Sequence, residues 1–280
     1  MQIDAHQHFW QIARGDYGWM NDEVAAIRRN VLPPDLAPTL ARHGIDGTVL
    51  VQAADTVAET EFMISLAAGA DFIKGVVGWV DLEDANAPAV LDRLSGAHVF
   101  KGIRPMLQDI DDTNWILQDK VQANLAEVAK RGLRFDALVQ PRHLSVLLEV
   151  AKTYPNLPIV IDHCAKPVIA RGADAGDGWR ADMAALAKHA NVFCKVSGLA
   201  NEYGDGWSAD TLRPVVSHVL DCFGPDRIMW GSDWPVLELA GTYDGWRAAV
   251  VTLFEGLSDA DRAAVMGGTA VRFYGLEQKS

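Results

Sequence analysis

The sequence contains few cysteines, and their spacing is not that of a metal or redox motif. Only three of the 280 residues are cysteines, and Cys164, Cys194 and Cys222 are far apart, without a CxxC spacing. Cys164 and Cys194 fall in apolar stretches typical of strands. We therefore expect buried free thiols in a reducing compartment and no disulfide framework.

Positive charge and long apolar runs are also scarce. The 25 Lys and Arg residues against 37 Asp and Glu residues leave a net charge of −12, which disfavours nucleic acid or an anionic membrane as a partner. No apolar run approaches the roughly 20 residues of a membrane span. The opening residues include Gln2 and Asp4, so they do not form the apolar region of a signal peptide. We expect a soluble, cytoplasmic, globular protein; its oligomeric state is not predicted.

Several catalytic motifs are missing. The chain has no Gly-rich phosphate loop, no GxSxG elbow and no HExxH helix, which disfavours nucleotide enzymes, serine hydrolases and zincins. The hydrophobic content of 49% is enough for one large core, and no linker or repeat divides the chain. Residues 1–280 are therefore expected to form a single domain.

Short apolar runs rich in β-branched residues alternate with amphipathic stretches along the whole chain. The runs predict strands at residues 3–9, 46–53, 73–80, 100–106, 134–140, 158–165, 191–198 and 228–235. The stretches between and after them predict helices at 35–42, 57–70, 86–94, 116–131, 141–154, 179–189, 208–223 and 243–257, and a short one ending at 273. Eight β/α units favour a (β/α)8 TIM barrel, with an open doubly wound sheet as the alternative.

The polar residues at strand ends are the candidates for chemistry. His6 and His8 are two apart, so on a strand their imidazoles point the same way and can converge. Asp233 ends the eighth strand, where Gly231 leaves room beside the carboxylate, and an unpaired carboxylate there is costly without a cation or donors. His163 shares a face with the buried residues of the sixth strand, whereas Asp162 has the opposite parity and is expected to anchor a helix or loop.

Basic residues recur near the same strand ends: Lys101, Arg104, Lys166 and Lys195. Arg104 is nearest the barrel mouth and is the best candidate to bind an oxygen-rich group, with salt bridging to loop carboxylates as the alternative. The remaining candidates for the pocket are Trp19, Lys101, Gln140, Lys166, Ser197 and Trp234, each of which could instead serve packing. The loops 11–21 and 200–207 follow strand ends and could form a lid or wall.

These motifs resemble those of the amidohydrolase superfamily, and within it the sugar-lactonase branch of L-fuconolactonase- and L-rhamnonolactonase-like enzymes. The resemblance spans the chain and rests on residues 6–10 (HQHFW), 16–20 (DYGWM), 162–167 (DHCAKP), 195–199 (KVSGL), 231–235 (GSDWP) and 268–276. It implies a (β/α)8 barrel in which activated water opens an L-fucono-, L-galactono- or L-rhamnono-lactone to the aldonic acid.

Carried onto this sequence, the resemblance implies roles for the strand-end residues. Asp233 would move the proton of the water, while His163 and Arg104 would stabilise the oxyanion. His6, His8 and Asp233 would hold a metal ion. Members with two metal ions have a further strand-end histidine that residues 134–140 lack, so we expect one divalent ion such as Zn²⁺, or catalysis without metal.

Two other functions remain open. The same barrel could serve a hydrolase or non-oxidative decarboxylase of an aromatic-derived carboxylate, but such substrates need two or more converging arginines and only Arg104 is well placed. A non-catalytic sugar-binding barrel is less compatible with two histidines and an aspartate at converging strand ends.

Overall fold

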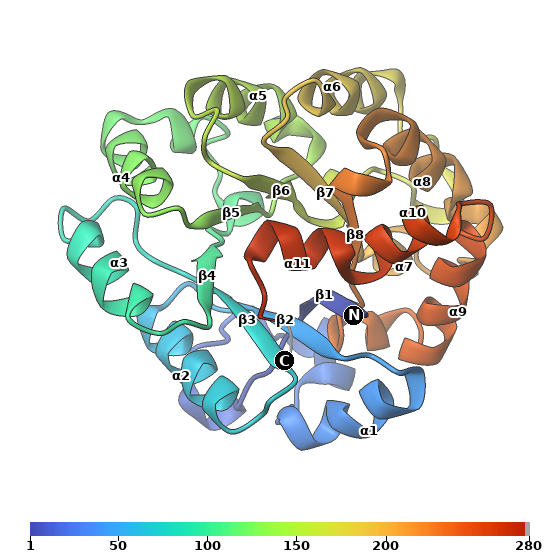
Figure 1. The fold of residues 1–280 in the computed structure, drawn as a ribbon, viewed down its shortest axis with the longest axis horizontal. Coiled ribbons are helices and arrows are strands. Elements are labelled where there is room, and N and C mark those ends of the chain that lie inside the picture. Colours follow the sequence, from blue (N-terminus) through green and yellow to red (C-terminus); the bar gives the residue numbers. More distant parts are fainter. Residues whose placement is uncertain (278–280) are drawn as a thin grey trace.

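Eight parallel strands form the centre of the molecule, and helices surround them (Figure 1). The computed structural model describes residues 1–277. The strands lie in chain order: β1 Ile3–Gln7, β2 Gly47–Val51, β3 Ile73–Gly78, β4 Phe100–Ile103, β5 Arg134–Ala137, β6 Ile159–Ile161, β7 Val192–Val196 and β8 Ile228–Trp230. The (β/α)8 barrel is thereby confirmed, and the open doubly wound sheet was the wrong alternative.

The helices follow the predicted alternation. They are α1 Pro33–His43, α2 Val57–Ala68, α3 Ala87–Ser95, α4 Asp119–Lys130, α5 Leu144–Thr153, α6 Asp177–Ala187, α7 Leu199–Tyr203, α8 Ala209–Phe223, α9 Tyr243–Leu253, α10 Asp259–Ala263 and α11 Thr269–Tyr274. The short helix α7 corrects the prediction of a loop at 200–207. Every strand ends two to five residues earlier than predicted, because the residues at its carboxyl end leave the sheet to form loops.

Helix α8 illustrates how the sequence directs a local element. The hydroxyl of Ser208 accepts a hydrogen bond from the amide of Thr211 and caps the helix start. Gly224 ends the helix with a φ of 69°, which glycine adopts without strain. Its buried residues recur every three or four positions and pack on the barrel; they are Leu212, Val215, Val216, Val219 and Phe223.

The barrel closes between β8 and β1 through the residues that follow these strands. The amide of His8 donates to the carbonyl of Trp234, and the amide of Asp233 donates to the carbonyl of His6, both at 2.8 Å. A Cβ atom on Gly231 would lie 2.6 Å from the Cβ of His6. Gly231 therefore makes room for the backbone of β1, and this close approach brings the two ends of the sequence together.

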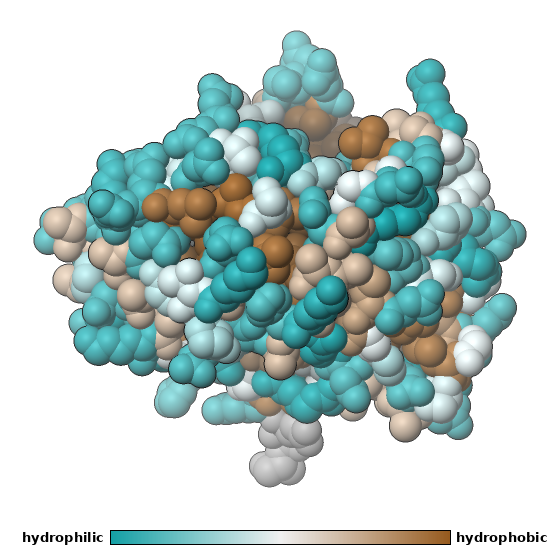
Figure 2. Space-filling model, turned by 90° about the horizontal axis from the view of Figure 1, so that it is seen from above, coloured by the Kyte–Doolittle hydropathy of each residue, from teal (hydrophilic) through white to brown (hydrophobic). Residues whose placement is uncertain are grey.

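The two ends of the barrel differ in chemistry. Helix α11 lies across the end where the strands begin, in front of them in Figure 1, and packs on an apolar cluster that includes Ile3, Val49 and Met229. The polar residues gather at the other end. Hydrophilic residues cover much of the face in Figure 2, with hydrophobic patches between them. Within residues 1–277, none of the helices has both the length and the apolar character required to cross a membrane.

Candidate active site

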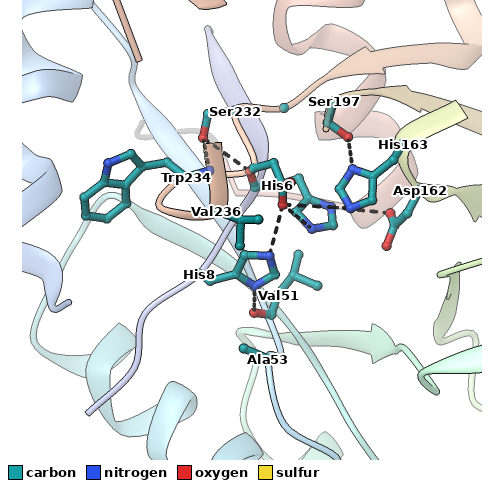
Figure 3. A network of polar contacts seen from close by, with 12 residues as sticks. His6, His8, Val51, Ala53, Asp162, His163, Ser197, Ser232, Trp234 and Val236 are labelled. Atoms are coloured by element: carbon teal, nitrogen blue, oxygen red, sulfur yellow. Dashed lines mark hydrogen bonds and ion pairs between the residues drawn. The ribbon is translucent and has the colours of Figure 1, made fainter. Parts of the chain in front are cut away.

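Three imidazoles converge on one carboxylate oxygen at the carboxyl ends of the strands (Figure 3). Oδ1 of Asp233 lies 3.3 Å from Nε2 of His8, 3.7 Å from Nε2 of His6 and 3.8 Å from Nε2 of His163. All four residues are at least 95% buried. The folded chain therefore gathers the histidines of β1, the histidine after β6 and the aspartate after β8 at one point.

The orientation of His8 leaves a lone pair facing the carboxylate. Its Nδ1 lies 2.7 Å from the carbonyl oxygen of Val51, which can only accept, so this nitrogen carries the proton. In neutral His8, Nε2 is then an acceptor, and it faces another acceptor, Oδ1 of Asp233, at 3.3 Å. A proton or a metal cation between these two atoms is needed to make the contact favourable.

His163 is held by an unusual turn. Residues His163 to Lys166 have φ values of 53°, 52°, 61° and 48°, a left-handed turn that costs non-glycine residues roughly 1–2 kcal/mol each. The indole nitrogen of Trp179 donates to the carbonyl of Cys164 and helps to hold the turn. This turn ends β6 at Ile161, so strand parity does not apply to Asp162 and His163, and both side chains reach the site.

Asp162 therefore corrects the prediction that it anchors a helix or loop. Its carboxylate lies 3.4 Å from Nδ1 of His6 and 3.3 Å from Nη1 of Arg104, and it is fully buried. The ammonium group of Lys195 is 3.0 Å away. Burial works to raise the pKa of Asp162, but Lys195, His6 and Arg104 together hold it well below its usual range.

A chain of buried charges lies beneath the histidines. Nζ of Lys195 is 2.6 Å from Oδ2 of Asp136 and 3.2 Å from Nδ1 of His6. The hydroxyl of Tyr274, on α11, donates to the same oxygen of Asp136 at 2.7 Å. Lys195 is fully buried, and the prediction that it lies at the rim was wrong, because its side chain points into the barrel toward β5 and β6.

Arg104 lies in the site, and most of its guanidinium group is occupied. Nη2 donates to the carbonyl and side-chain oxygens of Gln52, and Nη1 lies 3.3 Å from Asp162. The buried Nε has no hydrogen-bond partner among residues 1–277. One donor of the Arg104 guanidinium group therefore has no partner among the described residues.

The electrostatics of the site favour the neutral forms of His6 and His163 and the ionised form of Asp233. Burial lowers the pKa of His163 to about 4, although Asp233 and Asp162 oppose this. Burial and the charge of Lys195 lower the pKa of His6 well below its usual range. Burial works to raise the pKa of Asp233, but His163, the hydrogen bond with His8, and His6 hold it below the usual range. At neutral pH, imidazole lone pairs and one carboxylate thus share the site.

A cavity of about 540 Å³ opens beside this cluster. Its polar lining residues are His8, Glu23, Arg104, Gln108, Asp109, His163, Lys166 and Asp233. The apolar ones are Trp19, Val24, Ala53, Met106, Leu138, Val236 and Leu239. The loop 11–21 thus contributes Trp19 to the wall, and Lys166, 3.6 Å from Glu202, lies at the rim. The cavity is large enough for one sugar ring, with both donors and acceptors around it.

Four of the predicted pocket residues lie outside this lining. Lys101 lies near the start of β4, at the end of the barrel opposite the cavity. There its ammonium group donates to the carbonyl of Gly275, which directly follows α11. Gln140 accepts from Arg142, and Trp234 donates from its indole to Glu238. Ser197 is fully buried, and its Oγ lies 2.9 Å from Nδ1 of His163, so it orients that ring from behind.

The donor set fits one divalent metal ion. Ligand atoms of His6, His8 and Asp233 lie within 4.8 Å of one another, and those of His6, Asp162 and His163 form a second such group. Two imidazoles and a carboxylate with an open position toward a cavity are the typical protein ligands of a catalytic zinc site. The two facing acceptors, His8 Nε2 and Asp233 Oδ1, support the first group.

Comparisons with known proteins agree with this geometry. The chain is 44% identical over 283 aligned positions to L-fucono-1,5-lactonase of Burkholderia ambifaria, covering 100% of this chain and 97% of that protein. It is 35% identical over 290 positions to L-fucono-1,5-lactonase of Burkholderia multivorans, covering 99% and 97%. The crystal structure of an amidohydrolase from Burkholderia multivorans with bound zinc superimposes with a TM-score of 0.92 at 34% identity, covering 99% of this chain and 100% of that one.

The amidohydrolase family profile matches residues 3–276, nearly the whole of the described chain. The match includes His6 in β1, His8 directly after it, and Asp233 in the segment after β8. On this evidence the protein is a member of the amidohydrolase family.

Proposed function

We propose that this protein hydrolyses a sugar 1,5-lactone of the L-fucono type to the aldonic acid. The observation that carries the proposal is the buried carboxylate of Asp233, on which three imidazoles converge at the wall of a cavity sized for one sugar ring. The full-length similarity of this protein to two L-fucono-1,5-lactonases supports the choice of substrate.

Asp233 is the proposed base and acid. Its carboxylate takes the proton of a water molecule that attacks the lactone carbonyl, and then returns the proton to the departing ring oxygen. The Nε2 atoms of the three imidazoles surround this carboxylate at 3.3 to 3.8 Å. Because a lactone is an activated ester, one well-placed carboxylate with good hydrogen-bond donors nearby can perform both proton transfers.

Arg104 and His163 are the proposed stabilisers of the developing negative charge. Arg104 has one unpaired donor, Nε, and its two other nitrogens are fixed by Gln52 and Asp162, so the group is already oriented before substrate binds. His163 is oriented by Ser197. The aldonate product carries a carboxylate at the same position, which the guanidinium also favours.

The rim side chains would hold the sugar hydroxyl groups. Lys166, Gln108 and Asp109 line the cavity and offer both donors and acceptors, while the ring of Trp19 offers an apolar face. A metal ion held by His6, His8 and Asp233 would polarise the lactone carbonyl and lower the pKa of bound water.

We expect the purified protein to release acid from L-fucono-1,5-lactone well above the spontaneous rate, measured with a pH indicator. L-galactono- and L-rhamnono-lactones, an aromatic-derived lactone carboxylate and a hydroxybenzoate complete the panel. Among the described residues, Arg104 is the only arginine of the lining, so carboxylate substrates should turn over poorly. Activity confined to the aromatic carboxylates would overturn the proposal.

The metal ligands can be tested without an activity assay. We expect His8→Ala to weaken zinc binding by at least about 100-fold, since removing even a residue that supports a ligand typically costs 10–100-fold. Zinc affinity is measured by competition with a coloured chelator. His43→Ala is the matched control, because His43 lies at the end of α1 and pairs with Asp244. Equal zinc affinity of the His8 variant and the wild type would show that zinc binds elsewhere.

A further inference from the structure

The residues that leave β2 are in contact with three parts of the site. The carbonyl of Val51 accepts from His8, both oxygens of Gln52 accept from Arg104, and the carbonyl of Ala53 accepts from the indole of Trp19 at 2.7 Å. We call residues 51–54 the β2 exit segment. Its conformation therefore decides where several residues of the proposed site lie.

Glu59 on α2 holds this segment from behind. Its carboxylate is fully buried and accepts from the amide of Ala53 at 3.1 Å and from the amide of Ala54 at 2.8 Å. Bonds between a carboxylate and backbone amides are among the stronger hydrogen bonds of a protein. Glu59 does not line the cavity, so it can influence a ligand only through the residues that it holds.

The sequence around Glu59 is typical of a helix cap, which is a different role from holding the β2 exit segment. Thr56 and Glu59 have the S/T-x-x-E spacing of a capping box, in which the glutamate bonds the amide of the capping residue. Thr56 does cap α2, since its hydroxyl accepts from the amide of Glu59 at 3.0 Å. The carboxylate of Glu59 instead reaches past Thr56 to Ala53 and Ala54. A helix cap alone does not explain that contact.

We propose that Glu59 is a positioning residue for substrate binding: through Ala53 and Ala54 it sets the indole of Trp19 at the wall of the cavity. Trp19 is 37% exposed, and the carbonyl of Ala53 is the hydrogen-bond partner of its indole nitrogen. The carbonyl of Ala53 fixes the indole nitrogen, and Glu59 fixes Ala53. This inference rests on the proposed function, since it takes the cavity as the lactone site.

The test is Glu59→Gln, which keeps the shape of the side chain but turns one acceptor into a donor that faces a backbone amide. We expect KM for the lactone to rise about tenfold, the loss of roughly one hydrogen bond, with kcat changed less than about twofold. Hydrogen exchange at the amides of Ala53 and Ala54 should rise as well. Glu61→Gln is the matched control, because Glu61 is exposed on the same helix and pairs with Arg93.

A double-mutant cycle with Trp19→Phe, which removes the indole N–H, separates positioning from a general structural effect. If Glu59 acts through Trp19, Glu59→Gln should raise KM less than about twofold in the Trp19→Phe background. A full tenfold rise there, or an unchanged KM in the single variant, would overturn the proposal. Should Glu59→Gln not fold, Glu59→Asp keeps the charge but shortens the reach, and the same outcomes apply to it.

The outcomes also distinguish this proposal from the proposed function. A wild-type protein without lactone turnover would contradict the lactonase function, whereas hydrogen exchange at Ala53 and Ala54 would still test whether Glu59 holds the segment. A wild-type protein with lactone turnover and a Glu59→Gln variant with normal KM would contradict the positioning role alone.

Discussion

Replacing Asp233 by asparagine is expected to lower kcat for lactone hydrolysis by about 10³-fold or more, near the upper end of what one acid–base group contributes. The amide keeps the size of the side chain but cannot take a proton from water. Asp233 is the carboxylate on which His6, His8 and His163 all converge, within 3.3 to 3.8 Å. Among residues 1–277, no other carboxylate lies within 4.0 Å of all three imidazoles.

Initial rates with L-fucono-1,5-lactone, corrected for spontaneous hydrolysis, measure this effect. Thermal unfolding shows whether the variant is folded. Asp226→Asn is the matched control, since Asp226 is exposed before β8 and pairs with Arg272, and its activity should stay within about twofold of wild type. An Asp233→Asn enzyme that kept a tenth of the activity would remove Asp233 from the proposed chemistry.

The second large effect is expected on stability. Lys195→Met should lower the free energy of unfolding by about 3–5 kcal/mol, the typical cost of leaving buried charges without their partner. The ammonium of Lys195 lies 2.6 Å from Asp136 and 3.0 Å from Asp162, and all three side chains are fully buried. Without Lys195, the carboxylates of Asp136 and Asp162 would share the bottom of the site, and among the described residues Arg104 would be the cationic side chain left beside Asp162.

Urea unfolding measures this loss, and two further variants interpret it. Lys101→Met is the control: Lys101 is a partly exposed lysine that donates to Gly275 at the other end of the barrel, so its removal should cost no more than about 1 kcal/mol. Adding Asp136→Asn to Lys195→Met should restore part of the stability, because one unpaired charge is removed. If the double variant were less stable than Lys195→Met, the charge argument would be wrong.

Much of the barrel could be predicted from local patterns. Each of the eight strands lies within one of the predicted apolar runs, and each predicted amphipathic stretch between them forms a helix. Both patterns are local, because burial on one face acts on each segment separately. The pairing of His6 and His8 followed from the same alternation along β1. Ser208, Thr56 and Ser258 each cap a helix start, an outcome that depends on a few neighbouring residues.

Predictions failed where a side chain's position depends on distant contacts. Lys101 and Arg104 are three positions apart in the sequence. Lys101, near the start of β4, contacts the residue after α11, whereas Arg104, directly after β4, contacts Asp162 in the site. Lys195 was expected at the rim because basic residues recur near the strand ends. Only the positions of Asp136 and Asp162 on neighbouring segments reveal that its side chain points into the barrel. Glu59 has the spacing of a helix cap, and only the position of β2 beside α2 reveals that it holds Ala53 and Ala54.

The sequence by itself determined the order of strands and helices, the paired imidazoles of β1 and the isolated carboxylate after β8, because these depend on periodicity and on the cost of burying charge. Tertiary structure alone decided that Asp162 joins the site. The left-handed turn from His163 to Lys166 overrides strand parity, and neighbours such as Trp179 and Lys195 stabilise a backbone conformation that local preferences oppose.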